Sequence, residues 1–148
     1  MLFRSVKDAN GCTQEGSEVV GEPTALTASD SHEDVKCNGG SDGSVTVTFG
    51  GGTAPYQVNF NGGGFVAQTS AKTYSGLTAG TYTWVVKDAN GCTKEGSEVV
   101  GEPTALTASA SKTNVLCNGA ADGTVNLTVE GGITPYTYAW SNGATTED

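Results

Sequence analysis

Apolar and polar residues alternate along several short stretches of this chain, a pattern typical of β-strands with one buried face. Three groups of apolar residues show it most clearly: Val45, Val47 and Phe49; Tyr56, Val58 and Phe60; and Tyr82, Trp84 and Val86. No stretch has the spacing of an amphipathic helix. The pattern therefore predicts an all-β fold with Val45, Val47, Tyr82 and Trp84 buried in its core.

Turn-forming residues separate these stretches. Asp42-Gly43, Gly50-Gly51-Gly52 and Asn61-Gly62 mark turns, and Asp88-Ala89-Asn90-Gly91 predicts a hairpin tip because Asn-Gly accepts two successive positive φ angles. Strands are expected at residues 26–35, 44–49, 56–60, 65–68, 72–77, 81–87 and 97–100. Short antiparallel strands at this spacing indicate an immunoglobulin-like β-sandwich.

One short motif refines this prediction. In Leu77-Thr78-Ala79-Gly80-Thr81-Tyr82, a Leu-x-x-Gly-x-Tyr step leads into the strand expected at 81–87. The step resembles a tyrosine corner, in which the phenol donates a hydrogen bond back to the turn before its strand. The alternative is an ordinary turn followed by a core tyrosine.

The chain also repeats itself with a period of eighty residues. Residues 6–13 return as 86–93, and Cys37-Asn38-Gly39 returns as Cys117-Asn118-Gly119. This period fits one small sandwich and is too long for a solenoid coil or a propeller blade. We therefore expect sandwich repeats in tandem: the C-terminal remnant of a preceding repeat at residues 1–24, one complete repeat at 25–104, and the N-terminal part of a following repeat at 105–148.

The two copies differ unevenly. Residues 6–29 and 86–109 differ only at Gln14 and Lys94, whereas 30–61 and 110–141 differ at most positions outside the turn motifs. Residues 1–5 depart from the repeat, since Arg4 stands where the other copy has Trp84. We interpret these five residues as a truncation or cloning scar.

Charge and composition exclude some partners. The formal net charge is −9, so nucleic-acid phosphates and anionic membrane surfaces are not expected to bind this chain. No apolar run is long enough for a transmembrane helix. Gly101-Glu102-Pro103-Thr104 predicts a short and stiff joint between repeats, because proline restricts its own backbone and that of the preceding residue.

The turn motifs together resemble one family. Cys37-Asn38-Gly39 with Asp42-Gly43, Gly51-Gly52 and Pro55-Tyr56 is similar to the SprB repeat of Bacteroidetes gliding-motility adhesins. The second copy has the same set and adds Trp140-Ser141-Asn142-Gly143, where the first copy departs with Asn59-Phe60-Asn61-Gly62. The resemblance covers nearly the whole chain apart from residues 1–5.

The resemblance implies a secreted, cell-surface protein without catalysis. We therefore expect a repeat module of a long bacterial adhesin or filament that acts as a stalk or spacer and serves surface adhesion or gliding motility. The expected partners are neighbouring repeats of the same protein and surface glycans or substrata. A carbohydrate-binding module of an exported protein is the alternative, and a domain carried on an exported hydrolase is a third hypothesis.

Catalytic and metal sites find little support in the residues. The single histidine, His32, lies in an acidic stretch, and the next copy has Lys112 there, so we expect a solvated polar edge strand and no enzyme activity. No cofactor is expected. Calcium is the weaker alternative, with Asp30, Glu33, Asp34 and Asp42 as candidate oxygen ligands, of which only Asp42 recurs, as Asp122.

Aromatic residues could also stack on sugars. Tyr56, Phe60, Tyr82 and Trp84 are the candidates for such contacts. Their alternation along the strands favours packing in the core instead.

The cysteines are candidates for disulfide bonds, since small secreted domains often depend on them. They are Cys12, Cys37, Cys92 and Cys117. Cys37 could pair with Cys92 inside one repeat, but their turns are expected at opposite ends of the sandwich, and a bridge needs Cα atoms within about 7 Å. Alternatively, stacked repeats would bring Cys37 to the Cys92 equivalent of the following repeat. Both arrangements stay open.

The two ends of the chain are expected to carry complementary strands. Residues 105–148 should expose an apolar face made by Val125, Leu127, Val129, Tyr136, Tyr138 and Trp140 on two strands. Residues 1–24 should supply two further strands. We therefore expect head-to-tail self-association, in which Val6 lies beside Tyr138 of another copy as Val86 lies beside Val58.

Overall fold

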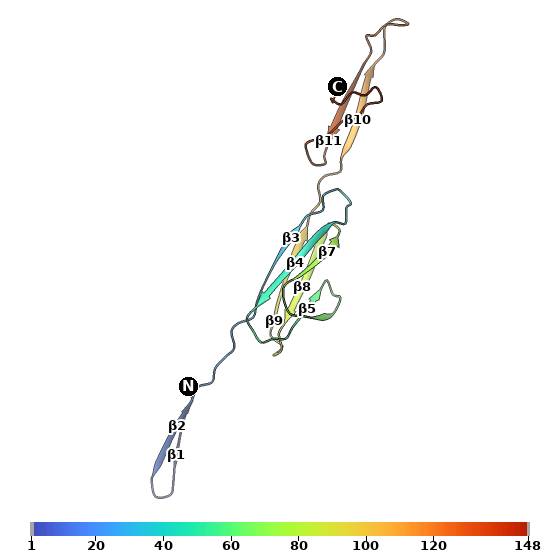
Figure 1. Ribbon diagram of the computed structural model, residues 1–148. Coiled ribbons are helices and arrows are strands. Elements are labelled where there is room, and N and C mark those ends of the chain that lie inside the picture. Colours follow the sequence, from blue (N-terminus) through green and yellow to red (C-terminus); the bar gives the residue numbers. More distant parts are fainter. Residues whose placement is uncertain (1, 148) are drawn as a thin grey trace.

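A computed structural model describes residues 2–147, and all its regular elements are β-strands. Figure 1 shows a hairpin, a two-sheet middle unit and a second hairpin following one another along the chain. The strands are β1 (Leu2–Lys7), β2 (Thr13–Glu18), β3 (Thr27–Glu33), β4 (Gly43–Gly50), β5 (Tyr56–Phe60), β6 (Phe65–Gln68), β7 (Lys72–Leu77), β8 (Gly80–Lys87), β9 (Thr93–Val100), β10 (Thr107–Thr113) and β11 (Thr124–Glu130). Across residues 2–147, no helix has the length and apolarity that crossing a membrane requires.

The middle unit, from β3 to β9, is an antiparallel two-sheet sandwich. One sheet has the strand order β3-β4-β7, and the other has the order β6-β5-β8-β9. The predicted all-β sandwich is thereby confirmed. Strand β6 pairs with β5, with Val66 opposite Val58, and so forms the outer strand of the four-stranded sheet. The immunoglobulin-like classification stays a prediction.

The core lies between these two sheets. Its buried apolar side chains are Leu26, Val35, Val45, Val47, Val58, Trp84, Val86 and Val100. Because successive side chains point to opposite faces of a strand, the alternation in the sequence becomes one buried face per strand. The predicted burial of Val45, Val47 and Trp84 is confirmed.

Tyr82 is half-buried, so the prediction that it is buried is wrong. Its hydroxyl donates a hydrogen bond of 3.0 Å to the Thr78 carbonyl oxygen, which confirms the tyrosine corner. The phenol must reach that surface turn, and this holds the ring at the edge of the core. There it stacks on Phe60, which stacks in turn on Tyr74, and burial raises the pKa of the Tyr74 phenol.

Strand β9 begins earlier than predicted. It runs from Thr93 and pairs with β8 along its whole length, whereas the alternation predicted a strand only at 97–100. Residues 93–95 are polar and exposed, so they carry no apolar signal. Backbone hydrogen bonds to β8 extend β9 over these residues, although their side chains are not buried.

The expected strand at residues 136–140 is not formed, so that prediction is wrong. The equivalent strand β5 is paired on both sides, by β6 and by β8. In the described part of the chain, residues 136–140 belong to no sheet. Without a ladder of hydrogen bonds, apolar alternation alone does not make a strand.

The two outer hairpins keep the register of their counterparts in the sandwich. Val6 lies opposite Gln14 in β1–β2, as Val86 lies opposite Lys94 in β8–β9. Likewise, β10–β11 repeats the pairing of β3–β4 residue by residue. Of the residues interpreted as a scar, Met1 lies outside the described residues, and residues 2–5 extend β1.

Candidate functional site at the junction between repeats

The connecting loops of the sandwich gather at its two opposite ends. The β3–β4 turn (residues 34–42) lies where β4 begins and where the chain leaves β9. The β4–β5 loop (residues 51–55) and the β8–β9 turn (residues 88–92) lie at the other end and are hydrogen-bonded to each other. The eight residues of β4 separate the two ends, a span of about 26 Å at roughly 3.3 Å per residue.

The chain leaving β9 is first tied to the start of the β3–β4 turn. The Val35 N–H donates a hydrogen bond of 3.1 Å to the Gly101 carbonyl oxygen. In return, the Gly101 N–H donates one of 2.6 Å to the Asp34 carboxylate. This pair of bonds fixes the direction in which the chain leaves the sandwich.

The next two linker residues bind the tip of the same turn. The Gly39 N–H donates a hydrogen bond of 2.7 Å to the Glu102 carboxylate. The Asn38 side-chain amide donates one of 3.1 Å to the Pro103 carbonyl oxygen. Proline fixes its own φ near −65°, so a linker held at Glu102 and Pro103 has few conformations left.

The linker is tied on its other side to the following copy. The Thr104 carbonyl oxygen accepts a hydrogen bond of 2.8 Å from Gly132, in the loop after β11. A cavity of about 230 Å³ lies at this contact, and residues from both copies line it: Lys36, Cys37, Asn38, Pro103, Thr104, Leu106, Gly132 and Ile133. We call these eight residues the junction. They join the β3–β4 turn of one copy to the loop that follows β11 in the next.

The earlier linker, residues 21–24, keeps one of these contacts, the hydrogen bond to the copy that follows it. The Thr24 carbonyl oxygen accepts a hydrogen bond of 2.8 Å from Gly52, as Thr104 does from Gly132. Within residues 2–147 no counterpart of the β3–β4 turn precedes this linker, and Glu22 is exposed. The two linkers have the same sequence, so they form a natural comparison.

At the opposite end, Asp88 fastens the β8–β9 turn to the β4–β5 loop. Its carboxylate accepts backbone hydrogen bonds from Asn90 (3.0 Å), Cys92 (2.8 Å) and Thr53 (3.0 Å). Burial by itself would raise the pKa of this carboxyl. The backbone donors outweigh burial and hold that pKa below its ordinary value of 3.8, because they stabilise the charged form.

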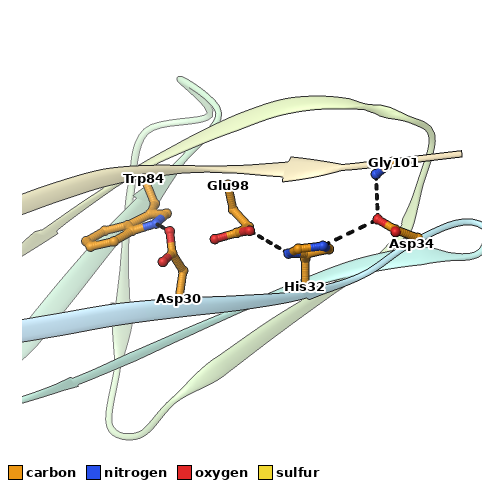
Figure 2. Close-up of polar contacts among 6 residues, drawn as sticks. All are labelled: Asp30, His32, Asp34, Trp84, Glu98 and Gly101. Atoms are coloured by element: carbon orange, nitrogen blue, oxygen red, sulfur yellow. Dashed lines mark hydrogen bonds and ion pairs between the residues drawn. The ribbon is translucent and has the colours of Figure 1, made fainter.

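His32 belongs to a row of polar contacts between β3 and β9 (Figure 2). Its Nδ1 lies 2.5 Å from the Glu98 carboxylate, and its Nε2 lies 3.4 Å from that of Asp34. The same row includes a hydrogen bond of 2.6 Å from the Trp84 indole to Asp30. The expected polar edge strand is present, and its side chains bind the neighbouring strand at the open edge between the sheets.

The acidic residues considered for calcium are engaged separately. Asp30 and Asp34 accept the hydrogen bonds at the β3–β9 edge, and Glu33 is exposed. Asp42 accepts a backbone hydrogen bond of 3.1 Å inside its turn, and Asp122 accepts one of 3.2 Å in the equivalent turn. In the part of the chain that the structure describes, no three His, Cys, Asp or Glu side chains form a group that could hold a metal ion.

The four cysteines have exposed, free thiols. Cys37 lines the junction, and Cys92 lies in the β8–β9 turn at the opposite end of the sandwich. A bridge between them inside one repeat is excluded, because a disulfide cannot span the length of β4. Cys117 and Cys12 hold the equivalent positions in the second copy and in the first hairpin.

The aromatic candidates for sugar binding belong to the core. Trp84 is buried, and Tyr56, Phe60 and Tyr82 pack against the core cluster, as the alternation predicted. The Tyr56 hydroxyl also donates a hydrogen bond of 2.6 Å to the carbonyl oxygen of Gly51. These rings therefore have protein neighbours on the faces that a sugar would need.

Sequence reasoning predicted a stiff joint but did not single out the residues that fasten it. Asn38 and Glu102 are 64 residues apart, and both bind backbone groups. The signal that could have found them is recurrence: the Cys-Asn-Gly and Gly-Glu-Pro-Thr motifs both occur twice, although the two strands after Cys-Asn-Gly diverge between the copies.

Comparison with known proteins gives one positive result. No curated protein matches this chain. No solved structure matches it either. The family model described as SprB repeat matches residues 29–65 and 109–145, two segments that are offset by the same eighty residues as the internal repeat. Each match runs from the first strand of a copy through its first three turns. Together the two matches cover half of the chain, which therefore belongs to the SprB repeat family.

Proposed function

We propose that this chain is a non-catalytic repeat module of a long bacterial cell-surface adhesin or filament, in which it serves as a stalk or spacer. Membership of the SprB repeat family supports a cell-surface location. The wider role that we propose is adhesion to a substratum or gliding motility, with neighbouring repeats as the immediate partners.

The observation that supports the spacer role is that the linker, residues 101–104, is hydrogen-bonded to both copies. Gly101, Glu102 and Pro103 bind the turn of one copy, and Thr104 binds the loop of the next. A spacer has to transmit direction from one module to the next, and a joint held on both sides does this. A flexible linker between independent domains would lack such ties.

Carbohydrate binding is the alternative function, and it has less support. The four aromatic candidates pack within the sandwich, and a sugar platform needs exposed aromatic faces. A glycan array probed with the chain discriminates the two functions. Saturable binding of one glycan class, lost on replacing an exposed aromatic such as Phe65, would favour the alternative.

Immunogold labelling of intact cells of the producing bacterium tests the spacer role. Antibodies against the chain are expected to place gold outside the cell envelope, at distances larger than an antibody alone can explain. An antibody against a periplasmic protein is the control and should label only permeabilised cells. Labelling by both antibodies only after permeabilisation would contradict the proposed location and function.

A further inference from the structure

Asparagine followed by glycine is the sequence most prone to spontaneous deamidation, because glycine has no side chain to shield its backbone nitrogen from the asparagine amide. The sandwich contains three such pairs in its turns: Asn38-Gly39, Asn61-Gly62 and Asn90-Gly91. The reaction needs a glycine nitrogen that is free and an asparagine side chain that can turn toward it. Hydrogen bonds that hold these two groups therefore control the rate at each pair.

At the junction, the linker holds both groups of one pair. The Gly39 N–H donates a hydrogen bond of 2.7 Å to the Glu102 carboxylate. The Asn38 side-chain amide donates one of 3.1 Å to the Pro103 carbonyl oxygen. Both asparagine and glycine are exposed, so solvent water reaches them. The contacts that keep the amide away from the nitrogen thus come from residues more than sixty positions further along the chain.

The pair Asn90-Gly91 is held equally well, but by other partners. The Asn90 side-chain amide donates a hydrogen bond of 3.0 Å to the Thr53 hydroxyl. The Gly91 N–H donates one of 3.1 Å to the Asp88 carbonyl oxygen. These acceptors lie at the end of the sandwich opposite to residues 101–104. Asn90 is therefore a matched reference that changes in the linker should not affect.

We propose that Asn38 is a deamidation site controlled by the junction: the reaction is suppressed while Glu102 and Pro103 bind the turn, and it proceeds when these contacts open. The proposal goes beyond the spacer role and does not rest on it, because the modification is measured in this chain wherever the protein acts. All the residues that carry the proposal lie inside the chain, between positions 38 and 103.

The reaction consumes one water and releases one ammonia. The Gly39 nitrogen attacks Cγ of Asn38, a carbon–nitrogen bond forms, and a five-membered succinimide ring results. The bond from Cγ to Nδ2 breaks, and the nitrogen leaves as ammonia with the proton that the glycine nitrogen gave up. Water then opens the ring at either carbonyl and gives aspartate or isoaspartate. No oxidant or reductant takes part.

The product cannot remake the contact that the amide made. The Asn38 amide donates to the Pro103 carbonyl oxygen, whereas a carboxylate at this position has no N–H to donate. It also places a negative charge near the Glu102 carboxylate, which binds the next residue of the turn. Isoaspartate additionally lengthens the backbone by one carbon atom. An opening that lasts long enough for the reaction therefore becomes a permanent loosening of the joint.

The first test compares rates of deamidation in the folded and the unfolded chain. The 148-residue chain is incubated in mildly alkaline buffer, with and without denaturant, and peptide mapping by mass spectrometry gives the rate at each asparagine. We expect Asn38 to react at least about fivefold more slowly in the folded chain, a ratio that one hydrogen bond accounts for. Equal rates at Asn38 in the two states would overturn the proposal.

A second test removes one linker contact. Glu102→Ala should raise the rate at Asn38 about fivefold and leave that at Asn90 unchanged. Glu102→Gln keeps an acceptor oxygen and should retain most of the protection. Glu22→Ala, at the equivalent position of the earlier linker, is the matched control and should change neither rate. An unchanged rate at Asn38 in Glu102→Ala, or an equal rise at Asn90, would overturn the proposal, because protection would then not come from the linker.

The aspartate product can be introduced directly to test its effect on the joint. Asn38→Asp should broaden the distribution of distances between spin labels on Cys37 and Cys117, measured by double electron–electron resonance with the two other cysteines changed to serine. Asn90→Asp, at the opposite end of the sandwich, is the control and should leave the distribution unchanged. Equal distributions in the natural sequence and in Asn38→Asp would overturn the claim that deamidation loosens the joint.

Discussion

The indole Nε1 of Trp84 donates a hydrogen bond of 2.6 Å to the Asp30 carboxylate, and this bond joins β8 to β3 across the edge of β9 (Figure 2). The bond links strands of different sheets. The second copy has Ala110 at the position of Asp30, so this acceptor is not part of every copy.

Replacing Asp30 is therefore expected to destabilise the sandwich. Asp30→Ala removes the acceptor of a buried indole N–H, and such an unpaired donor costs about 1–3 kcal/mol. Chemical denaturation followed by tryptophan fluorescence measures the loss. Glu33→Ala, exposed on the same strand, is the control and should change stability by less than about 0.5 kcal/mol. Equal effects from the two changes would contradict this role of the bond.

Gly96 makes room for the same indole. A Cβ added at Gly96 would overlap Cζ2 of Trp84, which no small shift relieves. Gly96→Ala should therefore cost about 1–3 kcal/mol, as overpacking does. The equivalent Gly16 has nothing within 4 Å of an added Cβ, so Gly16→Ala is a matched control that should be nearly neutral. An equal shift of the unfolding temperature in Gly96→Ala and Gly16→Ala would contradict this role of Gly96.

The turn at Asp88 predicts a pH dependence with a definite sign. The pKa of its carboxyl is depressed in the folded state, so its contribution is complete above the ordinary value of 3.8 and is lost as the pH falls through the lower folded pKa. Stability should therefore drop below pH 3.8 in the natural chain, and the drop should be smaller in Asp88→Asn. Asp8→Asn lies in the equivalent turn of the first hairpin, outside the sandwich, and should leave the pH profile of the sandwich unchanged. If stability fell with pH to the same extent in the natural chain, Asp88→Asn and Asp8→Asn, Asp88 would not be the source of the pH dependence.

Much of this fold could be predicted from the sequence, because alternation and turn residues are local signals. Val45 and Val47 are buried as their alternation requires, and Tyr82 makes the corner that its Gly-x-Tyr step predicts. The position of β6 beside β5 and the early start of β9 could not be predicted, since both depend on backbone pairing with the preceding strand and not on alternation of apolar side chains. The strand expected at 136–140 is not formed, because such pairing is missing there.

The junction was predicted only in outline. Pro103 indicates a stiff linker, and the structure adds the ties from Asn38 and Gly39 to it. A side chain that binds a backbone group more than sixty residues away leaves no periodicity, so only the shared recurrence of two motifs could reveal it.

Removing one hydrogen bond between the linker and the β3–β4 turn should increase the motion between successive copies without unfolding the sandwich. Glu102→Ala removes the acceptor of the Gly39 N–H, an exposed contact whose loss should cost less than about 1 kcal/mol of unfolding free energy. We expect a broader distribution of distances between spin labels on Cys37 and Cys117, measured by double electron–electron resonance with Cys12 and Cys92 changed to serine. Glu22→Ala, at the linker that lacks the turn, is the control and should not broaden it.

The same measurement on the otherwise unchanged chain tests the central claim, that consecutive repeats are held in a fixed relation by the junction. In dilute solution, labels on Cys37 and Cys117 occupy equivalent turns of successive copies and should give one narrow distance. Labels on Cys12 and Cys92 are also eighty residues apart, but they span the linker tied on one side only, so their distribution should be broader. A broad distribution between Cys37 and Cys117, or equal widths for the two pairs, would contradict a fixed junction.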